Sequence, residues 1–187
     1  TPTVEGREAA VRQVEMKLVH NSPLSWALLT LLFVAPAFGI TPQVTLALSS
    51  TSGTAGNSVP LDLVLSTTGI QPAGLQWTFQ YNTADFSGIS VVAGSSATSS
   101  GKTIYCNSVS GTVTCLLAGA NSTAIPNGIV ARATLTLSTS TNLSRAVDVS
   151  NSFASSSAGD FMTSLGTPGT VTIPPTSSLS GLSCNPS

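Results

Sequence analysis

The chain has 187 residues, of which only 7% are charged, and its formal net charge at pH 7 is −1. After residue 39 the basic residues are Lys102, Arg132 and Arg145, too few to form the cationic cluster that neutralises nucleic-acid phosphates. No His follows His20 and no Glu follows Glu15, so a serine nucleophile would lack its usual base and paired-carboxylate chemistry would depend on scattered Asp residues. This composition argues against a nucleic-acid-binding protein and against an enzyme.

Residues 16–39 have the pattern of a secretory signal peptide. A short basic start at Met16 is followed by the apolar stretch 26–34 and then by the small-residue sequence Ala35-Pro-Ala-Phe-Gly39. The stretch is well short of the roughly 20 apolar residues that a membrane helix needs. We therefore expect only transient contact with a membrane, and a secreted protein that is extracellular or at the cell surface. A buried helix of a globular domain is the alternative.

Residues 1–15 precede Met16, a candidate initiator, and the chain does not begin with Met. We interpret them as a non-native or mis-called extension. The alternative is an amphipathic helix ahead of the signal. In either case they contribute nothing to the prediction of the fold.

From residue 40 onward, apolar and polar residues alternate with the period of two that is typical of half-buried strands. In segment 75–81 the apolar residues share one face and the polar residues share the other. The predicted strands are 44–48, 59–65, 75–81, 86–93, 103–107, 112–118, 129–137, 146–153 and 171–173. Because Gly, Ser, Thr and Asn turns separate them and no helix is expected after the signal, residues 40–174 are predicted to form an all-β, nine-stranded antiparallel β-sandwich.

Two cysteines are placed symmetrically about Ser110-Gly111. If these two residues form a hairpin turn, Cys106 faces Cys115 at a non-hydrogen-bonded pair, where Cα atoms approach to about 4.5 Å. That separation suits a disulfide, and export permits one, so a Cys106–Cys115 bond is predicted. Two buried free thiols or a different turn register are the alternatives. No zinc-ligand cluster or calcium loop is present in the sequence, so no metal or other cofactor is predicted.

The C-terminal residues 175–187 begin as a Pro/Ser linker. Their last part, Leu182-Ser-Cys-Asn-Pro-Ser187, resembles the opening strand of bacterial immunoglobulin-like repeats, in which a Cys soon pairs with a later one. No later Cys follows Cys184 in this sequence. We therefore expect a linker followed by the truncated start of a second module.

The ordered set of local patterns resembles the cohesin family. Segment 69–82, Gly-Ile-Gln-Pro-Ala-Gly-Leu-Gln-Trp-Thr-Phe-Gln-Tyr-Asn, is similar to the family's aromatic-rich strand that ends in Tyr-Asp or Tyr-Asn. Segments 55–63, 127–135 and 169–173 are similar to its early Gly-Val-Pro, late Gly-Ala and closing strands. The resemblance covers roughly residues 43–174. It implies jelly-roll topology, in a fold related to bacterial carbohydrate-binding modules, and binding of dockerins, the calcium-loaded modules of polysaccharide-degrading enzymes.

The resemblance also implies a binding face. Cohesins contact their partners through outward residues of the third, fifth, sixth and eighth strands of one sheet. Matched through the alternation, the partner-binding candidates are Gln76, Thr78, Gln80, Tyr105, Asn107, Thr112 and Thr114. For each of them, an ordinary solvent-facing position on a sheet is the alternative.

We therefore expect a secreted, non-catalytic, cohesin-like module. It would dock a dockerin-like partner, with calcium on the partner, in extracellular polysaccharide degradation or cell-surface assembly. Direct binding of a polysaccharide is one alternative, but it needs coplanar exposed aromatics, and Trp77, Phe79 and Tyr81 share a face with Leu75 and are expected in the core. A structural spacer of a surface adhesin is the other alternative.

Overall fold

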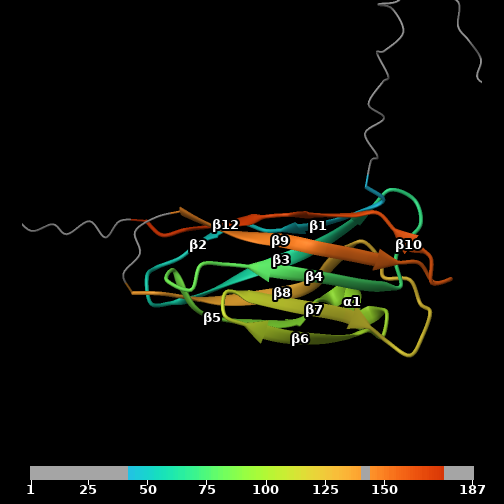
Figure 1. The fold of residues 1–187 in the computed structure, drawn as a ribbon, viewed down its shortest axis with the longest axis horizontal. Helices are drawn as coiled ribbons and strands as arrows, with labels where there is room; N and C mark the ends of the chain where they lie inside the picture. Colours follow the sequence, from blue (N-terminus) through green and yellow to red (C-terminus); the bar gives the residue numbers. More distant parts are fainter. Residues whose placement is uncertain (1–41, 140–143, 175–187) are drawn as a thin grey trace, which may run out of the picture. The chain divides into compact units, whose positions relative to one another are not determined.

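The computed structural model describes residues 42–139 and 144–174. Within these ranges the chain forms twelve strands and one short helix (Figure 1). The strands are β1 (Val44–Leu48), β2 (Thr51–Ser52), β3 (Ser58–Thr67), β4 (Gly74–Gln80), β5 (Phe86–Ala93), β6 (Thr103–Val109), β7 (Thr112–Ala118), β8 (Gly128–Leu137), β9 (Ser144–Ser155), β10 (Phe161–Met162), β11 (Ser164–Thr167) and β12 (Gly169–Thr172). The helix, α1, is Ser95–Ser99, and no helix in the described ranges has the length and apolarity to cross a membrane.

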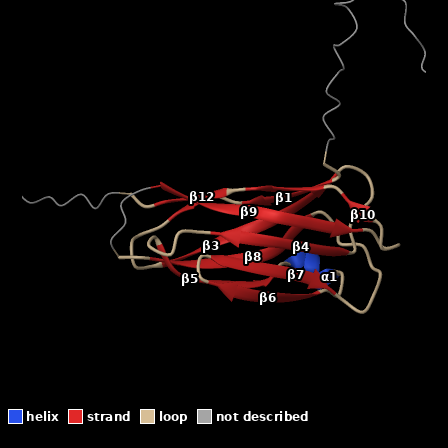
Figure 2. Ribbon diagram, in the orientation of Figure 1, coloured by secondary structure: helices blue, strands red, loops and turns tan. Residues whose placement is uncertain are grey.

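The strands form two sheets, and Figure 2 shows how little of the described chain is helical. The five-stranded sheet has the order β11-β1-β3-β8-β5. The seven-stranded sheet has the order β2-β12-β9-β4-β7-β6, with β10 paired to β9 outside this path. Neighbours are antiparallel except for β1 with β11 and β12 with β2, which are parallel. The all-β sandwich with jelly-roll topology that the sequence predicts is confirmed.

The core lies between the inner sides of the two sheets. In β4, Leu75, Trp77 and Phe79 point inward and are buried, and in β3 the alternate residues Leu61 and Leu63 are buried in the same way. The rings of Trp77 and Phe79 pack edge to face with their centroids 6.1 Å apart. Because side chains alternate across a strand, the polar neighbours of these residues point to the outer sides of the sheets.

The structure contains more strands than the nine expected. The nine predicted segments correspond to β1, β3 to β9 and β12, while β2, β10 and β11 are only two to four residues long. Strands this short contain too few residues to show an alternation. Helix α1 was also not predicted, because its sequence is Ser- and Thr-rich. The hydroxyls of Thr98 and Ser100 donate to the carbonyl oxygens of Gly94 and Ser96 at 2.9 Å, which satisfies them inside the helical turn.

The predicted Cys106–Cys115 disulfide is present and joins β6 to β7. The strand register places Val109 opposite Thr112 and Cys106 opposite Cys115, as the turn at Ser110-Gly111 requires. The two Cα atoms are 4.1 Å apart. Gly111 has a φ of 78°, the left-handed conformation that glycine adopts easily in a tight turn.

Removal of this disulfide should weaken the domain. We expect the Cys106→Ser/Cys115→Ala variant to lose about 2–3 kcal/mol of unfolding free energy, because the unfolded chain is no longer constrained by a short closed loop. Urea denaturation of the variant and of the wild type, each with and without dithiothreitol, measures the effect. The reductant should destabilise only the wild type. Equal stability of the oxidised wild type and the variant would contradict the expectation.

The expected extension 1–15, signal peptide 16–39 and terminal segment 175–187, which contains Cys184, lie outside the described residues. The strands β1 to β12 all fall within the expected domain, 40–174. The outer boundaries of that domain therefore stay predictions.

Candidate functional site

The outer side of the seven-stranded sheet brings the predicted contact residues together. Four adjacent strands, β9, β4, β7 and β6, place directly opposite residues in rows, and opposite residues of antiparallel strands point to the same side of a sheet. The three rows are Phe153–Gln76–Leu116–Tyr105, Ser150–Thr78–Thr114–Asn107 and Asp148–Gln80–Thr112–Val109. We call these twelve residues the outer face. All seven predicted contact residues belong to it.

The seven residues differ in what they offer to a partner. Those that are exposed or half-buried are Gln76, Gln80, Tyr105, Asn107, Thr112 and Thr114. Tyr105 is the aromatic residue of this group, and 62% of its surface is exposed. Thr78, in contrast, is only 5% exposed, and its hydroxyl shares a 3.0 Å hydrogen bond with the hydroxyl of Thr114. Thr78 therefore links β4 to β7 and offers almost no free surface.

Three apolar members of the outer face were not assigned from the sequence. Leu116 lies in the middle of the first row and is 45% exposed; Val109 and Phe153 are also exposed. For Leu116 the signal was available, because it is two residues beyond Thr114 in an alternating strand. The apolar side chains lie among amide and hydroxyl groups, so the outer face is mixed in character.

The sequence pattern did not place Phe153 on the outer face, because β9 is irregular. Gln76 pairs with Phe153 but Thr78 pairs with Ser150, so β9 has one extra residue between these two positions. Asn151 there has a φ of 47°, an unusual conformation for a residue other than glycine. Such a bulge reverses the alternation of side chains. A strict period of two counted from Val147 places Phe153 in the core, whereas the bulge brings it onto the outer face.

Phe153 has an exposed aromatic neighbour in the short strand β10. The ring centroids of Phe153 and Phe161 are 5.1 Å apart, with an interplanar angle of 55°. Phe161 also lines a pocket of about 340 Å³ together with Ile70 and Asp160. The first row of the outer face thus ends in an apolar cluster at one edge and in Tyr105 at the other.

The outer face is almost free of charge. Among its twelve residues Asp148 is the one carboxylate, and none is Lys or Arg. Two other acids form ion pairs away from the outer face. Asp85 pairs with Arg145 at 2.8 Å. Asp62 pairs with Arg132 at 2.6 Å, on the five-stranded sheet. The outer face therefore has a weak electrostatic field for long-range attraction and a surface suited to short-range contact.

Two titratable groups away from the outer face have shifted pKa values. The hydrogen bond from Arg132 lowers the pKa of Asp62, against a smaller opposing effect of burial. Burial lowers the pKa of Lys102, whose ammonium group donates to the backbone and side-chain oxygens of Asn121 at 2.8 and 2.9 Å. Both groups stabilise local structure, and neither faces a cleft with a nucleophile.

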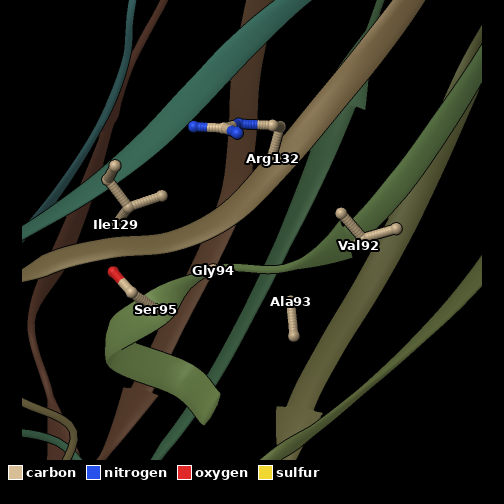
Figure 3. Close-up of a pocket in the computed structure, with 6 residues that line it drawn as sticks. All are labelled: Val92, Ala93, Gly94, Ser95, Ile129 and Arg132. Atoms are coloured by element: carbon tan, nitrogen blue, oxygen red, sulfur yellow. The ribbon is translucent and has the colours of Figure 1, made fainter. Parts of the chain in front are cut away.

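A pocket of about 200 Å³ lies between β5 and β8, at the edge of the five-stranded sheet. Figure 3 shows the residues that line it. Its walls include Val92 and Ile129, and its polar side chains are Ser95 and Arg132. The guanidinium of Arg132 is already paired with Asp62. The described part of the chain contains no histidine that could act as a base for Ser95. In residues 42–139 and 144–174, no three His, Cys, Asp or Glu side chains gather as a metal site would require.

Trp77 does not form a sugar-binding platform, because it is 0% exposed. Tyr105 and Phe153 are exposed, but they lie at opposite ends of the first row, about 14 Å apart at the usual spacing of strands. The rings of Phe153 and Phe161 are tilted and not coplanar. The aromatic pattern thus differs from the flat row that direct carbohydrate binding needs.

Comparison with known proteins is informative at the level of structure. No family model and no curated protein matches the sequence. Solved structures do match. The sixth cohesin of scaffoldin B from Acetivibrio cellulolyticus, in complex with a dockerin, is 21% identical with a TM-score of 0.61, over 70% of this chain and 98% of that one. A type I cohesin–dockerin complex from Clostridium thermocellum matches at 14% identity and a TM-score of 0.61, over 70% of this chain and 99% of that one.

A non-cellulosomal cohesin from the archaeon Archaeoglobus fulgidus matches as well, at 13% identity and a TM-score of 0.61, over 72% of this chain and 94% of that one. The chain has the cohesin fold. The strands that the resemblance selected as third, fifth, sixth and eighth are β4, β6, β7 and β9, and these four are neighbours in one sheet. None of these structures supports the expected immunoglobulin-like start after residue 175.

Proposed function

We propose that this chain is a non-catalytic docking module whose outer face binds a dockerin-type protein. The observation that carries the proposal is the convergence of all seven predicted contact residues on one side of β9-β4-β7-β6 in a cohesin fold. Two of the similar structures are complexes of a cohesin with a dockerin. Their low identity to this chain leaves the partner to be tested.

The chemistry of the outer face suits a protein partner. Leu116 provides an exposed apolar side chain in the first row, and its neighbour Tyr105 combines an apolar ring with a hydroxyl that donates and accepts hydrogen bonds. The amide of Asn107 is exposed in the adjacent second row, and the amide of Gln80 is exposed in the third row. Aromatic and apolar anchors surrounded by hydrogen-bonding groups are typical of protein–protein interfaces. The partner surface should therefore be mixed, with apolar groups opposite Leu116 and Tyr105 and hydrogen-bonding groups opposite the second row.

The weak charge of the outer face has a consequence for binding. Exposed charges attract over distances limited by salt screening, and here only Asp148 could contribute from the outer face. We infer that the affinity depends little on ionic strength. The signal pattern in residues 16–39 favours a role outside the cell or at its surface, in polysaccharide degradation or in the assembly of surface proteins.

Calcium dependence of binding provides the test. The chain from Ile40 onward, a compact unit of its own, is immobilised and exposed to calcium-loaded dockerin modules from the same genome. We expect one or more to be retained in calcium and released by EDTA. The thermal melting of the chain alone should be the same with EDTA, because the calcium belongs to the partner. Failure of every dockerin to bind a folded chain would refute the proposal.

Direct polysaccharide binding is the second candidate. The rings of Phe153 and Phe161 are tilted and do not form a flat row, but both are exposed and in contact, and this exposed aromatic pair is the observation in its favour. Depletion of the chain from solution by cellulose or chitin measures it. If binding to these solids is lost in Phe161→Ala while dockerin binding persists, the two activities are separate. A chain that binds neither class would fit a structural spacer.

A further inference from the structure

Strand β6 is an open edge of the seven-stranded sheet. It is the last strand in the order, and in the part of the chain that the structure describes its pairing partner is β7. Six of its seven residues are exposed, and Ile104 is half-buried. Side chains on both sides of the strand are therefore in contact with solvent, including Cys106 and Ser108, which point away from the outer face. Figure 1 shows β6 at the margin of the sandwich.

The turn determines which backbone groups of β6 are free for pairing. In a hairpin with a two-residue turn, the residues that flank the turn form a hydrogen-bonded pair, and the pair types then alternate along the strands. Val109 and Thr112 flank the turn, so Asn107 and Tyr105 bond to β7. The N–H and C=O groups of Ile104, Cys106 and Ser108 consequently point away from β7, toward solvent.

Strand β6 has none of the features that usually protect an edge. Its sequence, Thr-Ile-Tyr-Cys-Asn-Ser-Val, contains no charge and no proline, and its pairing with β7 has no bulge. The other sheet ends differ: β2 and β11 have two and four residues, and β5 has a register shift between Phe86 and Gly88. The disulfide to β7 also holds β6 in register.

We propose that two copies of this chain associate through their β6 strands, antiparallel about a two-fold axis at Cys106. In this register Cys106 lies opposite Cys106 of the second copy, and Ile104 lies opposite Ser108 of the second copy. All three residues with outward backbone groups are then paired, and each such pair exchanges two hydrogen bonds. An axis at Tyr105 would need Lys102, which is buried, and an axis at Asn107 would need Ser110 in the turn.

A second copy suits this edge better than an unrelated strand. The outward-pointing positions Ile104, Cys106 and Ser108 are symmetric about Cys106, so the edge is complementary to itself. No like charges are brought together, because β6 is uncharged. The pairing also places the two outer faces side by side in one continuous sheet without covering either of them. The inference is therefore independent of the proposed docking function.

Sedimentation velocity of the chain from Ile40 onward, over a range of concentrations and without any partner, tests the dimer. We expect a concentration-dependent dimer whose dissociation constant rises about tenfold or more in Ser108→Pro, because proline removes an outward N–H group without removing a bond to β7. Ser108→Ala keeps the N–H group and should leave the dimer unchanged. Circular dichroism melting checks that both variants fold.

A pair of double variants tests the register. In the proposed dimer Tyr105 lies opposite Asn107 of the second copy, so Tyr105→Lys/Asn107→Lys should be monomeric while Tyr105→Glu/Asn107→Lys should dimerise. A wild type that is monomeric at every concentration would overturn the proposal. A dimer whose dissociation constant is unchanged in Ser108→Pro and in both double variants would also overturn it. Because no dockerin is present, these results are separate from the outcome of the docking test.

Discussion

Replacement of Arg145 by methionine should lower the free energy of unfolding by about 2–3 kcal/mol, less than for a fully buried pair because 36% of the arginine side chain is in contact with solvent. Asp85 is a carboxylate with only 4% of its side chain exposed, and the Nε atom of Arg145 lies 2.8 Å from its Oδ2 atom. The two atoms are close but lack hydrogen-bond geometry, so their interaction is mainly between charges. Methionine keeps the apolar stem but leaves Asp85 buried without its cation. Urea denaturation at pH 7 measures the loss.

Arg132→Met is the matched control. The pair of Arg132 and Asp62 is exposed on the five-stranded sheet, with 53% of the arginine side chain in contact with solvent, so water screens it and its loss should change stability little. The partner lowers the pKa of Asp62. Any contribution is therefore present above the unfolded-state pKa of Asp62 and is lost as the pH falls through its lower folded-state pKa. Equal losses in Arg132→Met and Arg145→Met would contradict the assignment of Asp85 as the critical buried charge.

Replacement of Leu116 by lysine should weaken binding of the dockerin-type partner about 30-fold or more, the effect of losing an interface hot spot. Leu116 is exposed in the first row of the outer face, between Gln76 and Tyr105, so lysine there would place a charge within the proposed desolvated contact. The core should not change, because Cys115 and Leu117 carry the inward side chains of β7. Isothermal titration with the retained dockerin measures the affinity.

Val92→Lys provides the control for this substitution. Val92 is also an exposed apolar residue on a strand, but it lies in β5 of the five-stranded sheet, beside Arg132. The variant adds the same charge at a position outside the outer face. Its affinity should equal that of the wild type. If Val92→Lys weakens binding as much as Leu116→Lys does, or if neither weakens it, the partner does not dock on the outer face.

Most of the fold was predictable because its main strands alternate regularly. In β7 the period of two separates core from surface throughout, and in β4 it does so except at the outward but buried Thr78, so the pattern placed Trp77 inside and Gln76 outside. The disulfide was predictable for a similar reason, since the turn at Ser110-Gly111 determines the facing pairs. Local sequence was sufficient in these cases because the neighbouring residues themselves determine the geometry.

The remaining features depend on contacts between distant parts of the chain. The bulge at Asn151 moves Phe153 to the outer face, and no residue type in this segment indicates that a bulge is present. Asp85 and Arg145 are far apart in the sequence and form an ion pair in the fold, and the alternation pattern did not predict this pairing. Thr78 occupies an outward position, yet it is covered between its neighbours in the second row. Thr78 is buried because strands on both sides of β4 cover it, and the sequence of β4 alone does not contain this information.

The alternation in β4 and β7 also shapes how this protein can change over evolutionary time. Each outer-face position in the middle of these strands lies between two inward residues, as Leu116 does between Cys115 and Leu117. A point mutation can therefore alter the proposed docking surface while the core stays intact. An insertion or deletion of one residue would exchange the two sides of the strand and disturb both at once. Under the proposed docking function, divergence of partner choice should proceed through substitutions within these strands, and length changes should accumulate in the loops.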